Sequence, residues 1–186
     1  MRGRLAGSSG FVELRYAGVS TWTDGLIERV TTYLDINEAR AAAERLAEER
    51  GQEVSEQNVE GVRRGYQRLR ETGQFPADTV QPDFVWDMSH YDGWTEQPIY
   101  AGAEGAQRFL DDWTAVWDDW EMEIEELHDV GDKVVAIVHQ RGRSKRSGML
   151  VEGSLGHVWT IREGRGTRME MYSDPREALK AVGLEP

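Results

Sequence analysis

The sequence of 186 residues contains no cysteine, which excludes disulfide bonds, thiolate metal sites and cysteine nucleophiles. It also lacks any excess of positive charge, with 22 Lys and Arg against 34 Asp and Glu, and its formal net charge is −12. Because such a chain repels phosphate backbones, nucleic acid is not expected as a partner. No apolar run approaches the roughly 20 residues of a membrane span, and residues 7–10 are Gly-Ser-Ser-Gly where a secretory signal would be apolar. We therefore expect a cytoplasmic protein with no membrane partner.

Two stretches of the chain resemble each other. Residues 150–181 align on residues 11–42 without a gap, and about a third of the aligned residues are identical. Each stretch is typical of a strand, a tight turn containing glycine, a second strand and a helix capped by an aspartate, Asp35 or Asp174. We therefore predict a flexible N-terminus at residues 1–10, a partial repeat at residues 11–50 and a complete domain at residues 55–186.

Hydrophobic periodicity gives the order of the remaining elements. A helix over residues 36–50 is expected to end near Gly51, and a second helix is expected from Ser55 to Gly73. After them come an irregular connector (74–83), a short strand (84–89), a helix (about 102–117) and two strands (120–130 and 134–143). With the repeated stretch, this order predicts an α+β fold, a cone-shaped roll whose curved antiparallel sheet wraps around helices and is open at one end.

Five motifs follow one another in the order of a known fold family. They are Asn58–Tyr66 with Gly73, Pro82–Asp87, Tyr100–Gly105, His157–Arg165 and Arg168–Asp174. With them, residues 55–186 resemble the SnoaL-like branch of the nuclear-transport-factor-2-like superfamily, which includes polyketide cyclases and ketosteroid isomerases. The resemblance implies the fold but no single chemistry, because this scaffold hosts isomerases, cyclases, hydrolases and binding proteins. One departure from the family pattern is Pro76, which shortens and breaks the usual second helix.

By the same resemblance, residues 11–50 correspond to the last two strands and the tail of an upstream copy. Two strands do not form a stable domain alone, so we expect them to pack on the complete domain or on a partner chain. The N-terminal copy has Gly18 and Ser20 where the later copy has His157 and Trp159. This difference predicts that only the complete unit carries a pocket.

Side-chain alternation and the resemblance together select three candidate catalytic residues. Residues two apart in a strand share a face, so the apolar concave face that holds Trp159 should also hold His157. In ketosteroid-isomerase-like relatives a carboxylate near this place is the general base, and the resemblance gives that role to Asp87. It gives Tyr66 and His157 the role of donors to an enolate. The structural alternatives are an Asp87 that only orients its loop, and a Tyr66 and a His157 that belong to the core.

The sequence contains seven tryptophans, which is a high number, and such large flat rings are suited to line a pocket. The predicted ligand-binding residues are Trp86, His90, Trp113, Trp117, His139 and Trp159. His90 lies in a loop placed to rim the cavity, whereas alternation leaves the face of His139 unresolved. No two histidines have close metal-ligand spacing, so no metal site is expected, and no cofactor is expected either.

These observations predict a protein that binds a small, largely apolar organic ligand. In the enzymatic version, acid–base catalysis by Asp87, assisted by His157 and Tyr66, isomerises or cyclises a cyclic carbonyl compound. The alternative is a non-catalytic binding or assembly module whose sheet face forms a homodimer. A third alternative is an epoxide hydrolase, which would need an Asp-Arg-Asp set, and we do not identify such a set in this sequence.

Overall fold

The computed structural model of the chain describes residues 2–4, 11–13, 16–23, 26–94 and 96–185. Its contacts divide the chain into two compact units, Met1–Gln52 and Glu53–Pro186, and each is described by itself. The predicted flexible segment at residues 1–10 and the predicted glycine turn at residues 24–25 fall mostly outside the described residues.

The helix α1 (Ile36–Thr72) contributes residues to both units. Two helices separated near Gly51 were expected, but α1 runs through this position without a break. A single glycine within a helix costs only about 1 kcal/mol relative to alanine, which the many Ala, Glu and Arg residues on either side can offset.

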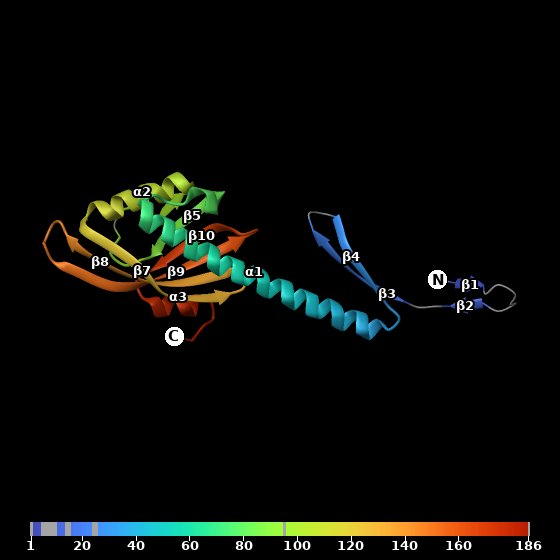
Figure 1. The fold of residues 1–186 in the computed structure, drawn as a ribbon. Coiled ribbons are helices and arrows are strands. Elements are labelled where there is room, and N and C mark those ends of the chain that lie inside the picture. Colours follow the sequence, from blue (N-terminus) through green and yellow to red (C-terminus); the bar gives the residue numbers. More distant parts are fainter. Residues whose placement is uncertain (1, 5–10, 14–15, 24–25, 95, 186) are drawn as a thin grey trace. The chain divides into compact units, whose positions relative to one another are not determined.

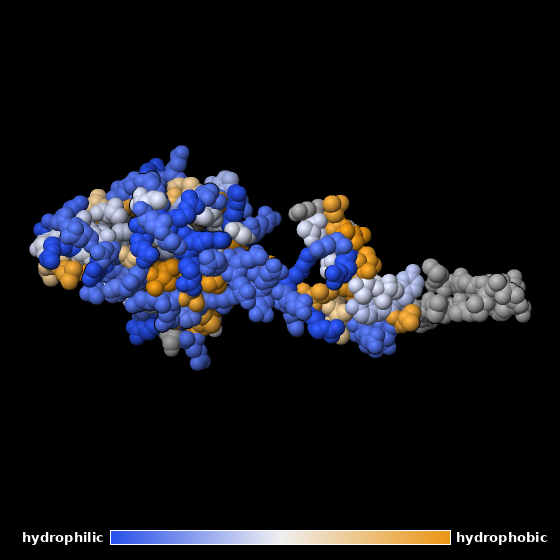
Figure 2. Space-filling model, in the orientation of Figure 1, coloured by the Kyte–Doolittle hydropathy of each residue, from blue (hydrophilic) through white to orange (hydrophobic). Residues whose placement is uncertain are grey.

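The N-terminal unit contains two antiparallel strand pairs (Figure 1): β1 (Arg2–Arg4) with β2 (Phe11–Glu13), and β3 (Ala17–Thr23) with β4 (Leu26–Tyr33). The first turn of α1 is capped as predicted, because the carboxylate of Asp35 accepts hydrogen bonds from the backbone N–H groups of Asn37 (2.6 Å) and Glu38 (3.2 Å). Figure 2 shows hydrophobic side chains gathered on the pair of strands β3 and β4, where Leu26 and Val30 are exposed.

The unit of residues 53–186 is built on one six-stranded sheet with the strand order β6-β5-β10-β9-β8-β7. Its strands are β5 (Val80–His90), β6 (Ile99–Ala101), β7 (Trp117–Val130), β8 (Lys133–Ser144), β9 (Leu150–Arg162) and β10 (Arg165–Tyr172). Strands β7 to β10 form an antiparallel meander, and β5 pairs with β10 in parallel. The short 3₁₀ helix η1 (Ala77–Thr79) precedes β5.

Helices cover the two faces of this sheet (Figure 1). On the concave face, α2 (Gly102–Ala115) contributes Phe109 and Trp113 to a core with side chains from β5, β9 and β10. The second half of α1 packs on the same face, where Val62 and Tyr66 meet side chains of β8 and β9. The opposite face is covered by α3 (Pro175–Ala181). The predicted α+β fold, with a curved sheet that is largely antiparallel, is confirmed.

Within the described part of the chain, no helix is both long enough and apolar enough to cross a membrane.

The contact between α3 and β9 depends on the absence of a side chain at Gly156. An added Cβ would overlap the methyl carbon of Ala178 and approach the Cα of Pro175 to 3.2 Å. Overpacking of this kind costs roughly 1–3 kcal/mol. We therefore expect Gly156→Ala to lower the free energy of unfolding by about that amount in urea denaturation. Gly153→Ala on the same strand is the control, because its Cβ would meet no atom within 4 Å. Equal stability of the two variants would contradict the packing described.

Candidate functional site

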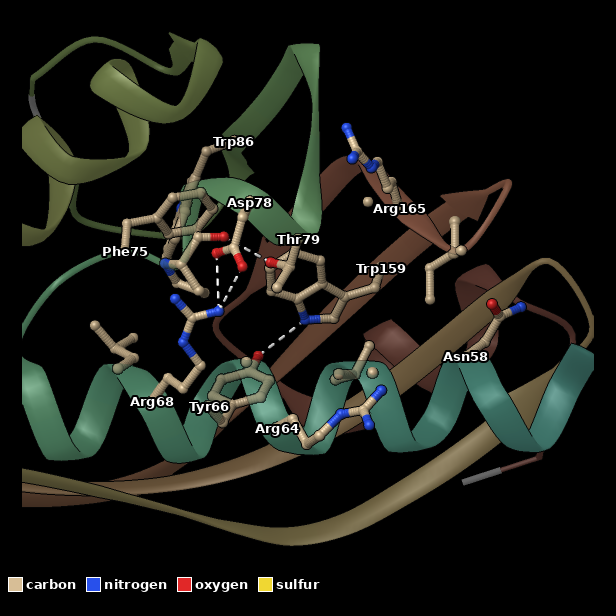
Figure 3. A pocket seen from close by; sticks show the side chains of 18 of the residues that line it. Asn58, Arg64, Tyr66, Arg68, Phe75, Asp78, Thr79, Trp86, Trp159 and Arg165 are labelled. Carbon is tan, nitrogen blue, oxygen red and sulfur yellow. Dashed lines mark hydrogen bonds and ion pairs between the residues drawn. The ribbon is translucent and has the colours of Figure 1, made fainter.

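A pocket of about 420 Å³ opens between the second half of α1 and the turn that joins β9 to β10 (Figure 3), and we call it the mouth pocket. Its volume is within the range of small-molecule sites, about 300–1,000 Å³. Its floor is apolar and largely aromatic: Val62, Tyr66, Leu69, Phe75, Trp86, Trp159 and Ile161. Its rim carries the charged residues Arg64, Arg68, Asp78, Glu163 and Arg165.

Tyr66 is the polar centre of the floor. Its hydroxyl lies 2.6 Å from Nδ1 of His157 and accepts a hydrogen bond of 3.0 Å from the indole N–H of Trp159. Tyr66 and His157 are both buried, at 7% and 6% exposure. His157 and Trp159, two residues apart on β9, both face α1, in agreement with the alternation of side chains in a strand. The structure thus brings together two of the three predicted catalytic residues, with Trp159 as a third member.

Burial keeps both groups of this pair neutral. It lowers the pKa of His157 to about 4, because a charged imidazole would be deprived of solvent. It raises the pKa of Tyr66 well above its ordinary value, an effect that the hydrogen bond from Trp159 only partly opposes. At neutral pH the site therefore contains a phenol and an uncharged imidazole.

The tautomer of His157 decides which group can serve a ligand. If Nδ1 carries the proton, the Tyr66 oxygen accepts from both His157 and Trp159, and its own O–H is free to donate. If Nε2 carries the proton, Tyr66 donates to Nδ1 and has no proton left for a ligand. Nε2 is buried and has no hydrogen-bond partner among the described residues. The first tautomer leaves Nε2 as an acceptor and directs the Tyr66 O–H to the mouth pocket, where solvent or a ligand can accept its proton.

Behind Tyr66 and Trp86 lies a second, inner cavity of only about 30 Å³. His157 lines this inner cavity and not the mouth pocket. The space is enough for one water molecule. It is narrow because aromatic rings fill the interior: Trp86 and Phe109 have ring centroids 4.5 Å apart, and Phe109 and Trp113 have centroids 5.7 Å apart. A ligand in the mouth pocket therefore meets Tyr66 before it meets His157.

Asp87 was expected to face the cavity with His157, and the structure places it on the opposite face of the sheet. Its neighbours Trp86 and Met88 belong to the concave core, so alternation directs Asp87 outward. There its carboxylate accepts hydrogen bonds from the guanidinium of Arg168 and, at 2.8 Å, from the backbone N–H of Ser89. Burial works to raise the pKa of Asp87, but these bonds and the charge of Arg168 outweigh it and hold the pKa below its ordinary value.

His90, predicted to rim the cavity, also lies on the outer face. Its ring stacks on Tyr172, with centroids 4.5 Å apart. Among the described residues, Asp87, His90 and Glu170 have potential metal-ligand atoms within 4.8 Å of one another. The guanidinium of Arg168, already paired with Asp87, lies 3.7 Å from Glu170, so a metal cation would compete with a fixed positive charge.

The other predicted ligand-binding residues lie in different places. Trp86 and Trp159 line the mouth pocket, and Trp113 lines the inner cavity. Trp117 packs against Trp113, at a centroid distance of 6.2 Å. His139 lies on the outer side of β8, where its ring nitrogens contact Ser154 and Glu152.

The charged rim was not predicted from the sequence. Arg64 and Arg68 are four residues apart, so they lie on one face of α1 on either side of Tyr66. Arg68 donates to both carboxylate oxygens of Asp78, each at 2.8 Å. The spacing of the two arginines is the only feature of the sequence that could have indicated the rim. Exposed arginines at this spacing are common on helices, so the spacing by itself does not indicate a pocket.

The match to a family agrees with this architecture. The model of the SnoaL-like domain family matches residues 75–169, half of the chain. The chain therefore belongs to the SnoaL-like domain family, within the nuclear-transport-factor-2-like fold. No curated protein matches the chain in sequence.

Solved structures share this fold at low sequence identity. TerC, co-crystallized with polyporic acid, is 24% identical with a TM-score of 0.56, over 68% of this chain and 98% of that chain. A nuclear-transport-factor-2-like protein of unknown function from Burkholderia pseudomallei is 17% identical with a TM-score of 0.56, over 68% and 98%. A protein from Jannaschia sp. described as a SnoaL-like polyketide cyclase is 21% identical with a TM-score of 0.51, over 71% and 95%. At these identities the similarity establishes the fold alone.

The low pKa of His157 makes the stability of the domain depend on pH. The folded state holds this imidazole neutral down to about pH 4, whereas the unfolded chain protonates it near its ordinary pKa of 6.5. Between these values the unfolded state binds more protons, so stability falls as the pH is lowered. We expect His157 to contribute a loss of roughly 2–3 kcal/mol between pH 7 and pH 4.5, at about 1.4 kcal/mol per pKa unit.

Urea denaturation of the wild type and of His157→Gln at several pH values measures this contribution. The variant has no imidazole at this position, so its stability should fall less steeply over the same interval. A parallel pH dependence of the two proteins, or an NMR titration of His157 with a midpoint above pH 6, would refute the assignment.

Proposed function

We propose that residues 53–186 bind a small, largely apolar organic molecule that carries a carbonyl group, and that the molecule occupies the mouth pocket. The observation that carries this proposal is the position of the Tyr66 hydroxyl at the floor of an aromatic pocket, where it accepts a hydrogen bond from Trp159 (Figure 3) and contacts Nδ1 of His157 behind it. With Nδ1 of His157 protonated, both nitrogens donate to Tyr66, and its O–H points to the ligand as a donor for the carbonyl oxygen.

The walls of the pocket support the apolar part of this proposal. The ring of Trp159 stacks on the buried Phe84, which does not itself line the pocket, with centroids 5.9 Å apart, and Phe75 contacts Trp86 at a centroid distance of 6.0 Å. A rigid aromatic wall binds a flat molecule with little loss of side-chain entropy. A protein of the same fold, TerC, was co-crystallized with polyporic acid, which is consistent with a small organic ligand.

Acid–base catalysis on the carbonyl compound is the second candidate. The 2.6 Å contact between Tyr66 and His157 favours it, because a proton could pass along this bond. Two features weigh against it: the pKa of about 4 makes His157 a weak base, and Asp87, the predicted base, lies on the other face of the sheet. We therefore rank binding without turnover first and assign Asp87 a role in holding β5 against β10.

The test compares 1-tetralone with tetralin, which has the same bicyclic shape but no carbonyl group. Tyr66→Phe removes the donor and leaves the ring, so it should weaken the binding of 1-tetralone by roughly five- to tenfold, as for a hydrogen bond of about 1 kcal/mol. The binding of tetralin should change less than twofold. Quenching of tryptophan fluorescence measures both affinities, since Trp86 and Trp159 line the pocket.

Tyr91→Phe is the control, because Tyr91 contacts Trp113 and does not line the mouth pocket. Equal losses for the ketone and the hydrocarbon in Tyr66→Phe would contradict the proposed hydrogen bond. The exchange of the hydrogens next to the carbonyl of 1-tetralone in D₂O, followed by NMR, separates the two candidates. Exchange accelerated by the wild type and lost in Tyr66→Phe and His157→Gln would establish catalysis in place of binding alone.

We also propose that residues 11–50 are a partial copy of the end of the complete domain. The strand registers support this: Val19 pairs with Thr31, and Val158, which is 139 positions further on, pairs with Glu170, 139 positions after Thr31. Both pairs of strands have their irregularity at the equivalent place, between Ile27 and Arg29 and between Gly166 and Arg168. Both are followed by a helix capped by an aspartate.

This division predicts that the complete domain does not depend on the partial copy. A chain that lacks residues 1–52 should unfold in one cooperative transition and bind 1-tetralone within about twofold of the full chain, because the pocket, its walls and the Tyr66 pair all lie after Gln52. Calorimetry and fluorescence titration measure the two quantities. Loss of cooperative folding in the shortened chain would show that the two units form one domain.

The homodimer through the sheet face and the cytoplasmic location stay predictions from the sequence.

A further inference from the structure

The rim of the mouth pocket has an excess of positive charge, in contrast to the net charge of the chain. Five charged side chains line the pocket, three arginines and two carboxylates, in a chain whose formal net charge is −12. Arg68 and Asp78 form a two-bond ion pair and neutralise each other. This hydrogen bond from Arg68 is the main cause that lowers the pKa of Asp78, and the charge of Arg165 adds a smaller contribution.

Two arginines remain on the rim. Arg64 comes from α1, and Arg165 begins β10 on the opposite side of the pocket (Figure 3). Neither forms a hydrogen bond or an ion pair with any of the described side chains. Glu163, in the turn before β10, is the remaining carboxylate of the rim. The three arginines and two carboxylates of the rim therefore have a net charge of +1, and they lie above an apolar floor.

We infer that the ligand of the mouth pocket is an organic carboxylate: an apolar ring system against the aromatic floor, with its carbonyl group at Tyr66 and a carboxylate at the rim between Arg64 and Arg165. This inference rests on the proposed function and specifies its ligand class. One excess positive charge suits a singly charged carboxylate better than a phosphate of higher charge. Guanidinium groups offer the paired N–H donors that a carboxylate accepts, so an arginine on either side of the rim can hold the anion while the ring system reaches Tyr66.

The experiment measures the affinity of the full chain for 2-naphthoate and for its neutral counterpart 2-naphthamide, at low ionic strength and in 0.15 M salt. We expect the wild type to prefer the carboxylate, and the preference to shrink with salt because the arginines are exposed. Arg64→Gln and Arg165→Gln should each weaken the binding of 2-naphthoate by about two- to fivefold, as for exposed ion pairs. Neither variant should change the affinity for 2-naphthamide by more than about twofold.

Arg63→Gln is the matched control, with the same change of charge on the neighbouring residue of α1, which does not line the pocket. A loss of 2-naphthoate affinity as large in Arg63→Gln as in Arg64→Gln would overturn the inference, because it would reflect net charge alone. Equal affinities for acid and amide, unchanged in the double variant Arg64→Gln/Arg165→Gln, would also overturn it while leaving the proposed function intact. Failure of both naphthalene compounds and of 1-tetralone to bind would instead overturn the proposed function and this inference with it.

Discussion

The hydrogen bonds of the Tyr66 hydroxyl are the constraint on which the rest of the site depends. They join α1 to β9 through His157, which is buried like Tyr66, and through Trp159, which is half-buried at the mouth pocket. A buried hydroxyl or imidazole without a partner costs about 1–3 kcal/mol, so each of the three groups needs the others to stay in place. The same bonds close the inner cavity behind Tyr66 and leave the mouth pocket in front of it. One polar cluster thereby sets both the position of the helix and the depth to which a ligand can enter.

The two faces of the sheet have different chemistry, and alternation decides which residue belongs to which. On the concave face, apolar rings surround one neutral polar pair. On the outer face, the Asp87 carboxylate is paired with Arg168 close to Glu170 and His90, which forms a charged network over β5 and β10. The network holds the parallel pair of strands together, where Glu170 lies opposite Asp87 in register. Charge is thus kept on the outer face of this part of the sheet, where even the buried Asp87 is paired with Arg168, and away from the aromatic core of the concave face.

The sequence predicted the fold well because its strands are long and regular. The alternation in β9 placed His157 with Trp159, since a strand of 13 residues fixes the face of every side chain. The same rule applied to β5 puts Phe84, Trp86 and Met88 inside and Asp87 outside, whereas the family resemblance implies a carboxylate that faces the cavity near this position. Gly51 was the signal for a helix end, but one glycine is only a weak helix breaker, and α1 continues through it. The charged rim depends on how the turn between β9 and β10 approaches α1, which is a tertiary contact with no local signature.

The geometry of the site supports the proposal that it holds a molecule over the proposal that it transforms one. Its donor is a phenol, its imidazole is neutral and set back, and the carboxylates near the mouth are at the rim. The most direct test of this account is a crystal structure of the chain with 1-tetralone bound. The account predicts the carbonyl oxygen about 2.5–3.0 Å from the Tyr66 hydroxyl, a hydrogen-bond distance, with the ring system against Trp159. A ketone oxygen that points to solvent, or a ligand bound outside the mouth pocket, would contradict it.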